Sequence, residues 1–230
     1  MRAGEYRRIR VLERKREAED TESIYFEDPL CSAASPGQFV MVWLPGIDEF
    51  PMSLSRIGGV SSITALRKGK GTEALLTAED ISIRGPFGNG FSPSAGKKVL
   101  IAGGIGMASL LPLVAEGDHV FLGARSAEYL PFVDEIAGRC AHLRTATDDG
   151  SMGFKGNVVD LFISARPEGH VYSCGPMGML KTLHEHKIKA EASLESYMKC
   201  AIGICDSCTI NGFIVCREGP VVRDLDRIFG

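Results

Sequence analysis

The sequence lacks a strong excess of charge of either sign: 26 Lys and Arg residues oppose 29 Asp and Glu residues, for a formal net charge of −3. Because nucleic-acid-binding proteins usually carry a basic surface, this balance argues against a nucleic-acid partner. A basic run at residues 7–16 is interleaved with Glu13, and we interpret it as a solvated pair of strands. The sequence also contains no internal repeat and no low-complexity tract.

Long apolar segments are scarce as well. Residues 99–115 form an uncharged stretch of 17 residues, which is at the bottom of the length range that spans a membrane. The stretch contains three glycines and Pro112, so a strand, a glycine turn and a helix explain it better than a membrane span. The first residues are polar and charged, and we therefore expect no export signal.

The cysteine count does not suit a framework of disulfides, because seven is an odd number. Together with the expected lack of an export signal, this count predicts a reducing, cytoplasmic location. In such a compartment, clustered thiols indicate metal or redox chemistry. Hydrophobic residues make up 44% of the chain, which is ample for globular cores.

Residues 1–95 are predicted to form an N-terminal antiparallel β-barrel. Short strands are expected at 24–26, 39–44, 52–55, 62–66 and 81–84. Glycine and proline separate them, as in small barrels.

Residues 96–190 change pattern, because strand-length and helix-length segments alternate. This alternation predicts a parallel α/β nucleotide-binding domain with helices on both faces of its sheet. The expected strands are 99–102, 120–123, 143–147 and 171–174, and the expected helices follow the glycines after 102 and occupy 127–139, 158–164 and 177–186. Asn157 is expected to cap the helix at 158–164.

Residues 191–230 contain four of the seven cysteines and are too few to build much of a core alone. Cys200, Cys205, Cys208 and Cys216 are spaced Cys-x4-Cys-x2-Cys-x7-Cys, and the first three match the plant-type ferredoxin spacing for a 2Fe–2S cluster. The alternative is a zinc site with four cysteine ligands, but such sites usually take two closely spaced pairs. We therefore predict a small C-terminal iron–sulfur segment.

Glycine-rich segments follow two of the expected parallel strands: Gly103-Gly104-Ile105-Gly106 and Cys174-Gly175-Pro176-Met177. Ligands of open α/β sheets bind beyond the carboxyl ends of the strands. Both glycine segments and Asp148-Asp149-Gly150 are expected at that edge, so their coincidence predicts a nucleotide site. In the barrel, Gly69-Lys70-Gly71-Thr72 precedes a helix-like turn and predicts a diphosphate cradle with free N–H groups. The alternatives are a tight turn without ligand, a buried thiol at Cys174 and a plain hairpin loop.

These segments occur together, and in the same order, in a known family. The motifs are Pro51-Met52-Ser53-Leu54, Gly69-Lys70-Gly71-Thr72, Gly85-Pro86-Phe87-Gly88-Asn89-Gly90-Phe91, Gly103-Gly104-Ile105-Gly106, Asp149-Gly150-Ser151, Cys174-Gly175-Pro176-Met177 and the four terminal cysteines. On this ordered set, the chain resembles the ferredoxin–NADP reductase superfamily. It is most similar to the electron-transfer subunits of NAD-dependent dihydroorotate dehydrogenase, over nearly its whole length.

The resemblance implies three cofactors. FAD would bind in the barrel, with Ser53 beside the isoalloxazine ring and Gly71 and Thr72 beside the pyrophosphate. NAD would lie across the parallel sheet, with its nicotinamide near Cys174 and Gly175. The four cysteines would carry the 2Fe–2S cluster. No side chain is assigned a catalytic role, because the cofactors carry the chemistry.

The resemblance also implies a partner. An FMN-containing catalytic subunit would oxidise dihydroorotate in pyrimidine biosynthesis and join this chain in a hetero-oligomer, a heterotetramer. Electrons would pass from FMN to the cluster, then to FAD, and then as hydride to NAD+. The same cofactors also serve in an NAD(P)H–flavin diaphorase subunit of another complex, such as a soluble hydrogenase or a ferredoxin reductase. That assignment stays open at this stage.

Two positions depart from the family pattern. Phe50 occupies the place where the family usually has an Arg that contacts the flavin diphosphate. The loss implies weaker FAD binding, FMN in its place, a relic fold without flavin, or compensation by Arg56, Arg67 or Lys68. Ser109 stands where the family often has Pro, and we expect it to alter only the helix start.

The choice between NAD and NADP also depends on the family argument. We expect NAD on that argument. Arg125 follows the second expected sheet strand, where an arginine would favour the extra phosphate of NADP.

Overall fold

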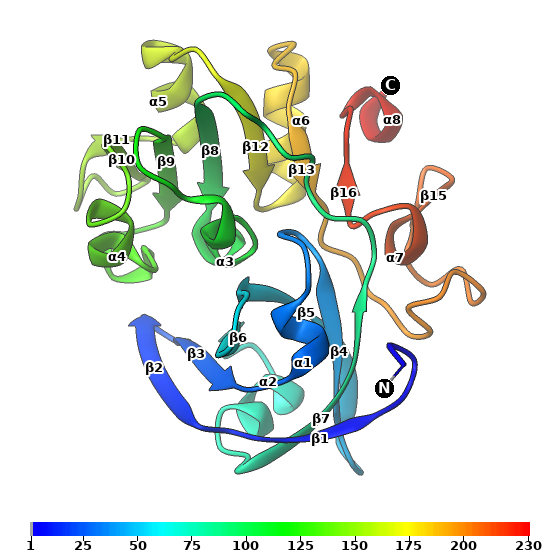
Figure 1. The fold of residues 1–230 in the computed structure, drawn as a ribbon. Coiled ribbons are helices and arrows are strands. Elements are labelled where there is room, and N and C mark those ends of the chain that lie inside the picture. The colour runs from blue at the N-terminus through cyan, green and yellow to red at the C-terminus, as the bar shows by residue number, and fades with distance from the viewer. Residues whose placement is uncertain (1) are drawn as a thin grey trace.

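The computed structural model describes residues 2–230 of the chain. Its N-terminal part is a curled antiparallel sheet of seven strands (Figure 1). The strand order is β1-β7-β4-β5-β6-β3-β2. The strands are β1 (Arg7–Arg10), β2 (Glu13–Ala18), β3 (Thr21–Phe26), β4 (Phe39–Leu44), β5 (Asp48–Arg56), β6 (Ser61–Leu66) and β7 (Asp80–Phe87). Two short helices connect them, α1 (Pro29–Ser32) and α2 (Lys70–Leu75). The predicted antiparallel barrel is confirmed.

Side-chain alternation explains which face of this sheet is packed. Ile81 and Ile83 of β7 are 2% and 0% exposed, whereas Ser82 and Arg84 are half-buried on the other face. Successive residues of a strand point to opposite faces, so one face of the sheet collects the apolar side chains. The barrel core that results also includes the completely buried Leu54.

The basic N-terminal run does form two strands, but they do not pair with each other. β1 pairs with β7, and β2 pairs with β3. Arg7 is only 7% exposed, and its Nε donates to the Asp28 carboxylate at 2.6 Å. A buried arginine is tolerated only when it is paired, which this contact provides. The prediction of a solvated strand pair was therefore wrong in two respects. The two strands pair with other strands, and Arg7 is buried.

The second sheet is the predicted parallel one, with strand order β11-β10-β9-β8-β12-β13-β16. Its strands are β8 (Lys98–Gly103), β9 (His119–Ala124), β10 (His142–Thr147), β11 (Phe154–Lys155), β12 (His170–Cys174), β13 (Glu191–Ser193) and the antiparallel edge strand β16 (Val221–Val222). In β8, Val99 and Ile101 pack into one core and Leu100 and Ala102 into another. Burial on both faces is the reason that this strand is an unbroken apolar run.

Helices cover both faces of this sheet, as predicted. α5 (Val158–Ala165) and α6 (Met177–Glu185) contribute to one core, while α3 (Met107–Leu110) and α4 (Val133–Ala137) contribute to the other. Asn157 caps α5, because its side chain accepts from the Asp160 N–H. In the part of the chain that the structure describes, no helix has the length and apolar character needed to cross a membrane.

The helix expected at 127–139 is shorter than predicted. The segment consists of the 3-10 turn η3 (Ala127–Tyr129) and then α4, with Pro131 between them. Phe132 has a φ of 63°, a left-handed conformation that interrupts a helix. The helix after the glycines is also split: the 3-10 turn η1 (Gly104–Gly106) precedes α3, and a second one, η2 (Leu111–Leu113), follows it with Pro112 inside.

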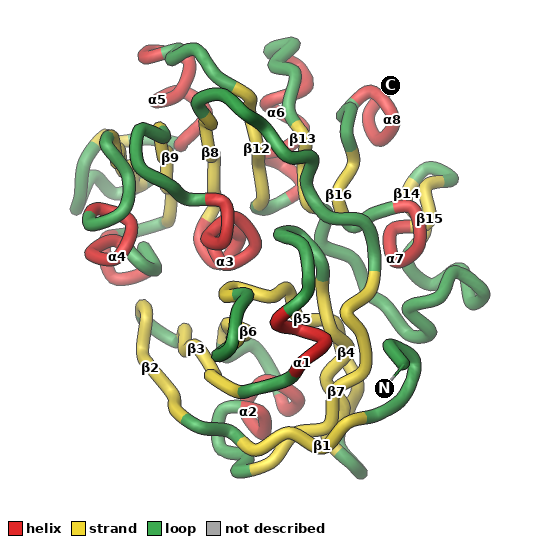
Figure 2. Tube along the Cα trace, in the orientation of Figure 1, coloured by secondary structure: helices red, strands yellow, loops and turns green. Residues whose placement is uncertain are grey.

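The C-terminal segment is mostly loop, as Figure 2 shows, with a two-stranded hairpin and two short helices. These elements are β14 (Thr209–Ile210), β15 (Phe213–Ile214), α7 (Val215–Glu218) and α8 (Asp226–Phe229). The segment is tied to the parallel sheet, because β13 and β16 are two of its strands. The domain boundary expected near residue 190 therefore falls beside a strand of that sheet.

Candidate functional site

The four predicted iron ligands lie in the C-terminal segment as two pairs. Cys200 is half-buried and Cys205 is exposed, and their side chains interact with each other. Cys208 and Cys216 are each 2% exposed and interact with each other. A two-iron cluster needs two thiolates for each iron, so this pairwise arrangement fits the predicted ligand set.

The loop around Cys200 directs backbone N–H groups at sulfur. The Ile202 and Ile204 N–H groups each donate to the Cys200 Sγ at 3.4 Å, and the Cys216 N–H donates to the Cys208 Sγ at 3.4 Å. Gly203, between the two isoleucines, has a φ of +80°, a conformation that favours glycine. N–H groups at cluster sulfurs tune the reduction potential, so the loop has the expected form.

The thiol pKa values differ between the two cysteine pairs. Burial raises the pKa of Cys200, but the N–H groups of Ile202 and Ile204 outweigh it and lower the pKa to about 6. Burial raises the pKa of Cys216 to about 12, and the neighbouring Cys208 adds to this effect. Among residues 2–230, no three His, Cys, Asp or Glu side chains are gathered to hold a single metal ion.

Arg84 of β7 fastens the cysteine loop to the barrel. Its Nη1 donates to the Cys200 carbonyl at 2.8 Å and its Nη2 to the Lys199 carbonyl at 2.9 Å. The Nε of the same guanidinium donates to the Glu49 carboxylate of β5 at 2.7 Å. Sequence reasoning missed Arg84, because nothing in its neighbourhood indicates a contact with residues 115 and 116 positions later.

A cavity of about 570 Å³ opens between the barrel, the parallel sheet and the start of the C-terminal segment. This cavity, called cavity A here, is lined by several of the predicted residues: Pro51, Met52, Ser53, Gly69, Gly71, Thr72, Gly106 and Cys174. Leu54 does not line it, because its side chain is completely buried in the barrel core. Sequence reasoning did not find the lining residues contributed by 193–198.

The predicted phosphate cradle has a different hydrogen-bond pattern from the one expected. Thr72 Oγ1 accepts from the Lys68 N–H at 2.9 Å and the Gly69 N–H at 3.2 Å. These two groups are therefore engaged within the turn, whereas the sequence argument counted on free N–H groups. Lys68 and Lys70 both line cavity A and bring positive charge to this end.

Phe50 also lines cavity A and explains one of the glycines. A Cβ atom on Gly71 would lie 2.9 Å from the Phe50 ring and 3.2 Å from the Asp48 carboxylate. Of the three residues considered as substitutes for the family arginine, Lys68 lines cavity A and Arg67 lines a second cavity. Arg56 lines neither.

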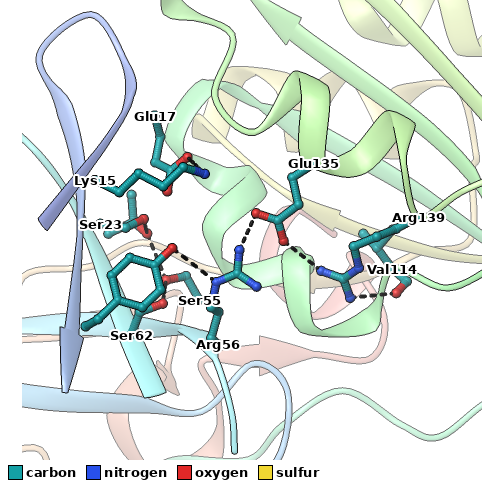
Figure 3. Close-up of polar contacts among 11 residues, drawn as sticks. Lys15, Glu17, Ser23, Ser55, Arg56, Ser62, Val114, Glu135 and Arg139 are labelled. Carbon is teal, nitrogen blue, oxygen red and sulfur yellow. Dashed lines mark hydrogen bonds and ion pairs between the residues drawn. The ribbon is translucent and has the colours of Figure 1, made fainter. Parts of the chain in front are cut away.

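Arg56 instead joins the two domains, as Figure 3 shows. Its Nε donates to the Tyr25 hydroxyl at 3.3 Å, and its Nη2 pairs with Glu135 of α4. Glu135 also accepts from Arg139 Nη1 at 3.0 Å, and Arg139 donates to the Val114 carbonyl at 2.9 Å. The proposal that Arg56 compensates for the missing phosphate ligand is therefore wrong.

The second cavity, called cavity B, has a volume of about 550 Å³ and lies at the carboxyl ends of β8, β9 and β10. Its lining includes three predicted residues, Gly103, Gly104 and Pro176. Asp148, which the sequence placed at the same sheet edge, also lines it. Further lining residues were not assigned to a ligand site from the sequence: Asp20, Thr21, Tyr129 and Asn157. Arg125 lines this cavity as well and stacks on the Tyr129 ring, 3.4 Å from its centroid.

The glycines that follow β8 and β12 have different structural roles. A Cβ on Gly106 would lie 2.3 Å from the Cys174 carbonyl oxygen, and one on Gly103 would lie 2.7 Å from the Pro176 ring. These two glycines let the end of β8 and the turn after it approach the end of β12 closely. Gly104 has open space around it and a φ of +51°. Gly175 is pressed against Gly103 and Met179, and Met177 lines neither cavity.

Cavities A and B meet. Leu66 and Ile105 line both of them. Cavity A is also lined by Tyr197 and Met198, which precede Cys200 by three and two residues. Cavity A therefore lies between the cysteine loop and cavity B.

The curled barrel, the parallel sheet and the shared cavity edge define a protein of the ferredoxin–NADP reductase fold with an added cysteine-rich segment. The chain is similar to the structure of an NADH-dependent reduced ferredoxin-NADP oxidoreductase, with a TM-score of 0.82, 26% identity, and coverage of 96% of this chain and 91% of that one. Phthalate dioxygenase reductase has a TM-score of 0.64 at 17% identity and covers 88% of this chain and 85% of its own. The latter similarity shows the fold alone.

Sequence comparisons narrow the class. The family model for the iron–sulfur cluster binding domain of dihydroorotate dehydrogenase B matches residues 195–225. The chain is 41% identical to a probable dihydroorotate dehydrogenase B (NAD(+)), electron transfer subunit, of Thermoplasma acidophilum, over 93% of this chain and 88% of that protein. It is 39% identical to the protein of the same description from Pyrococcus horikoshii, over 94% and 89%. The chain therefore belongs to the family of dihydroorotate dehydrogenase B electron transfer subunits.

Proposed function

We propose that this chain carries electrons from a dihydroorotate-oxidising, FMN-containing partner to NAD+ through a 2Fe–2S cluster and FAD. The cluster would be held by Cys200, Cys205, Cys208 and Cys216, the flavin would lie in cavity A, and the dinucleotide would lie in cavity B. A cluster passes electrons singly and NAD+ accepts a pair as hydride, whereas a flavin exchanges both. The chain would act in the cytoplasm, where thiols stay reduced.

The arrangement of the three sites carries this proposal. Cavity A shares Leu66 and Ile105 with cavity B and reaches Met198 beside the cysteine loop. A carrier that exchanges both single electrons and hydride belongs between a cluster and NAD+. The middle position of cavity A supports the assignment of flavin to it.

The residues of cavity A suit a flavin. Its volume of about 570 Å³ is within the usual range for small-molecule sites. Ser53 and Met52 of β5 would face the ring, while Lys68, Lys70 and the glycines at 69 and 71 would hold the phosphates. These lysines support FAD binding in spite of Phe50.

NAD is the dinucleotide that we propose for cavity B. Arg125, the residue that would favour NADP, is stacked on Tyr129 in this structure. Asp148 lines the same cavity and would repel an additional phosphate. The printed descriptions of both relatives name NAD(+) and dihydroorotate dehydrogenase B, which favours this function over a diaphorase of another complex.

The partner would bind over the cysteine loop. Ile202 and Ile204 are 53% and 78% exposed, and Tyr197 is 66% exposed. Large apolar side chains in a loop that also carries Cys205 suit a protein interface next to the cluster. A heterotetramer of two such chains and two catalytic subunits is the assembly that we propose.

The decisive experiment is a count of cofactors in protein purified without oxygen together with the catalytic subunit. We expect two irons, two acid-labile sulfides and one FAD per copy of this chain, with NAD+ reduction that depends on dihydroorotate. Zinc in place of iron would contradict the cluster assignment. Purification with a hydrogenase or another partner would contradict the dihydroorotate assignment.

A further inference from the structure

The Ser109 hydroxyl in α3 is buried without a hydrogen-bond partner. Ser109 is 2% exposed, and its Oγ makes no hydrogen bond within the described residues. The other buried side-chain atoms in this state are Arg14 Nε and Glu17 Oε1, in β2 of the barrel. Among these described atoms, Ser109 Oγ alone belongs to a residue that lines cavity A or cavity B.

An unpaired hydroxyl is unusual for a helix of this protein. Helical serines and threonines commonly donate to a carbonyl three or four residues earlier. Ser164 of α5 donates to the Leu161 carbonyl at 2.7 Å, and Thr182 of α6 donates to the Gly178 carbonyl at 3.0 Å. The Ser109 hydroxyl makes no such bond, so it is available to a group inside cavity A.

On the side of the sheet, Ser109 lies near the Cys174 thiol. Cys174 of β12 and Ser193 of β13 also line cavity A. Burial raises the pKa of the Cys174 thiol to about 12, and the Glu195 carboxylate adds to that rise. The Ser193 and Ser109 hydroxyls lie near the thiol and lower its pKa, although the Ser109 Oγ makes no hydrogen bond of normal geometry to it. Cys174 is therefore a neutral thiol. A hydroxyl can both donate and accept a hydrogen bond, so a group that offers a donor and an acceptor side by side suits it.

We propose that the Ser109 hydroxyl hydrogen-bonds an amide edge of the ring system bound in cavity A and acts as a positioning residue for that ring. This inference rests on the proposed function. The pyrimidine side of the isoalloxazine and the carboxamide of nicotinamide both present such an edge. The family often has Pro at this position, which offers no hydroxyl, so the contact distinguishes this chain from those relatives.

The test compares Ser109→Ala with Ser164→Ala, a matched change in a helix outside cavity A. Flavin-free protein of each variant is titrated with FAD, and FAD-loaded protein is titrated with NAD+. We expect Ser109→Ala to weaken one of these affinities about 3- to 15-fold, the effect of one lost hydrogen bond. The flavin absorption bands should also shift, whereas Ser164→Ala should change neither the affinities nor the bands.

The thermal midpoint of flavin-free protein separates positioning from packing. Removal of an unpaired buried hydroxyl should leave the midpoint of Ser109→Ala unchanged or raise it by about 2–4 °C. A weaker FAD affinity identifies the isoalloxazine as the partner, and a weaker NAD+ affinity alone identifies the carboxamide; both support the inference. Unchanged affinities, or a lowered midpoint, overturn it. Failure of the unsubstituted protein to bind FAD would instead refute the proposed function.

Discussion

At the scale of single residues, Cys205 separates cluster binding from the nucleotide chemistry. It is exposed in the cysteine loop, and it does not line either cavity. We expect Cys205→Ser to lose iron and labile sulfide while the reduction of artificial dyes by NADH continues. Cys140→Ser, a change of a half-buried cysteine outside the loop, should keep its iron. Loss of dye reduction together with iron would show that the two sites are not separate.

Phe50 is the second residue with a direct consequence. It occupies the place of the family arginine and lines cavity A beside Gly71. A cation there would gain a charge-assisted hydrogen bond to the flavin diphosphate, so we expect Phe50→Arg to bind FAD about tenfold more tightly. Phe50→Gln, which is polar but uncharged, serves as the control in the same fluorescence titration.

Riboflavin, which lacks phosphate, checks the cause of that effect. Its affinity should be the same in Phe50→Arg and Phe50→Gln. If both flavins responded equally to the arginine, the contact would be with the ring and not with the phosphates.

At the scale of elements, the contact between β5 and α4 sets how the barrel meets the nucleotide domain. Glu135 is paired with Arg56 and with Arg139, and its side chain is 15% exposed. Arg56 is about a third exposed, so solvent weakens the pair. We expect Glu135→Gln to lower the free energy of unfolding by about 1–2 kcal/mol, as measured by urea denaturation.

Glu185→Gln is the matched control for this change. Glu185 pairs with Lys181 within α6 at 3.8 Å, and both side chains are about 60% exposed. Loss of this pair should lower the free energy of unfolding by at most about 0.5 kcal/mol. Equal costs for the two variants would show that the pair between β5 and α4 is no stronger than a solvated one.

At the scale of the whole molecule, the cysteine loop is placed at the edge of the protein but joined to both domains. Arg84 ties it to the barrel, and β13 and β16 tie its flanks to the parallel sheet. This position leaves one side of the loop, with Ile202 and Ile204, exposed to a partner while Met198 lines cavity A.

A charged substitution tests whether the partner binds the exposed side of the loop. We expect Ile204→Asp to weaken binding to the catalytic subunit about tenfold or more, because a charge replaces an apolar contact. The iron and flavin content of the isolated chain should not change. Leu12→Asp, at a 53% exposed position on the barrel, is the control in the same binding titration. Equal binding by both variants would place the partner elsewhere.

Local patterns were sufficient for most of the elements. The strand at 81–84, the apolar run at 99–102 and the Asn157 cap depend on neighbouring residues, and the structure has all three, in β7, β8 and α5. The helix at 127–139 failed because Pro131 and the left-handed Phe132 interrupt it, and a count of helix-length residues does not register that. Arg7 and Arg56 were misjudged because their partners, Asp28 and Glu135, are distant in the chain.

The sequence by itself determined the order of barrel, parallel sheet and cysteine segment, and the ligand spacing in that segment, because these depend on residues close together in the chain. Only the tertiary structure decided that cavity A lies between the cysteine loop and cavity B. That arrangement depends on Leu66 and Ile105 meeting across the domains and on Arg84 reaching Cys200. Contacts between residues far apart in sequence leave no periodic signal, so packing of the whole chain is needed to establish them.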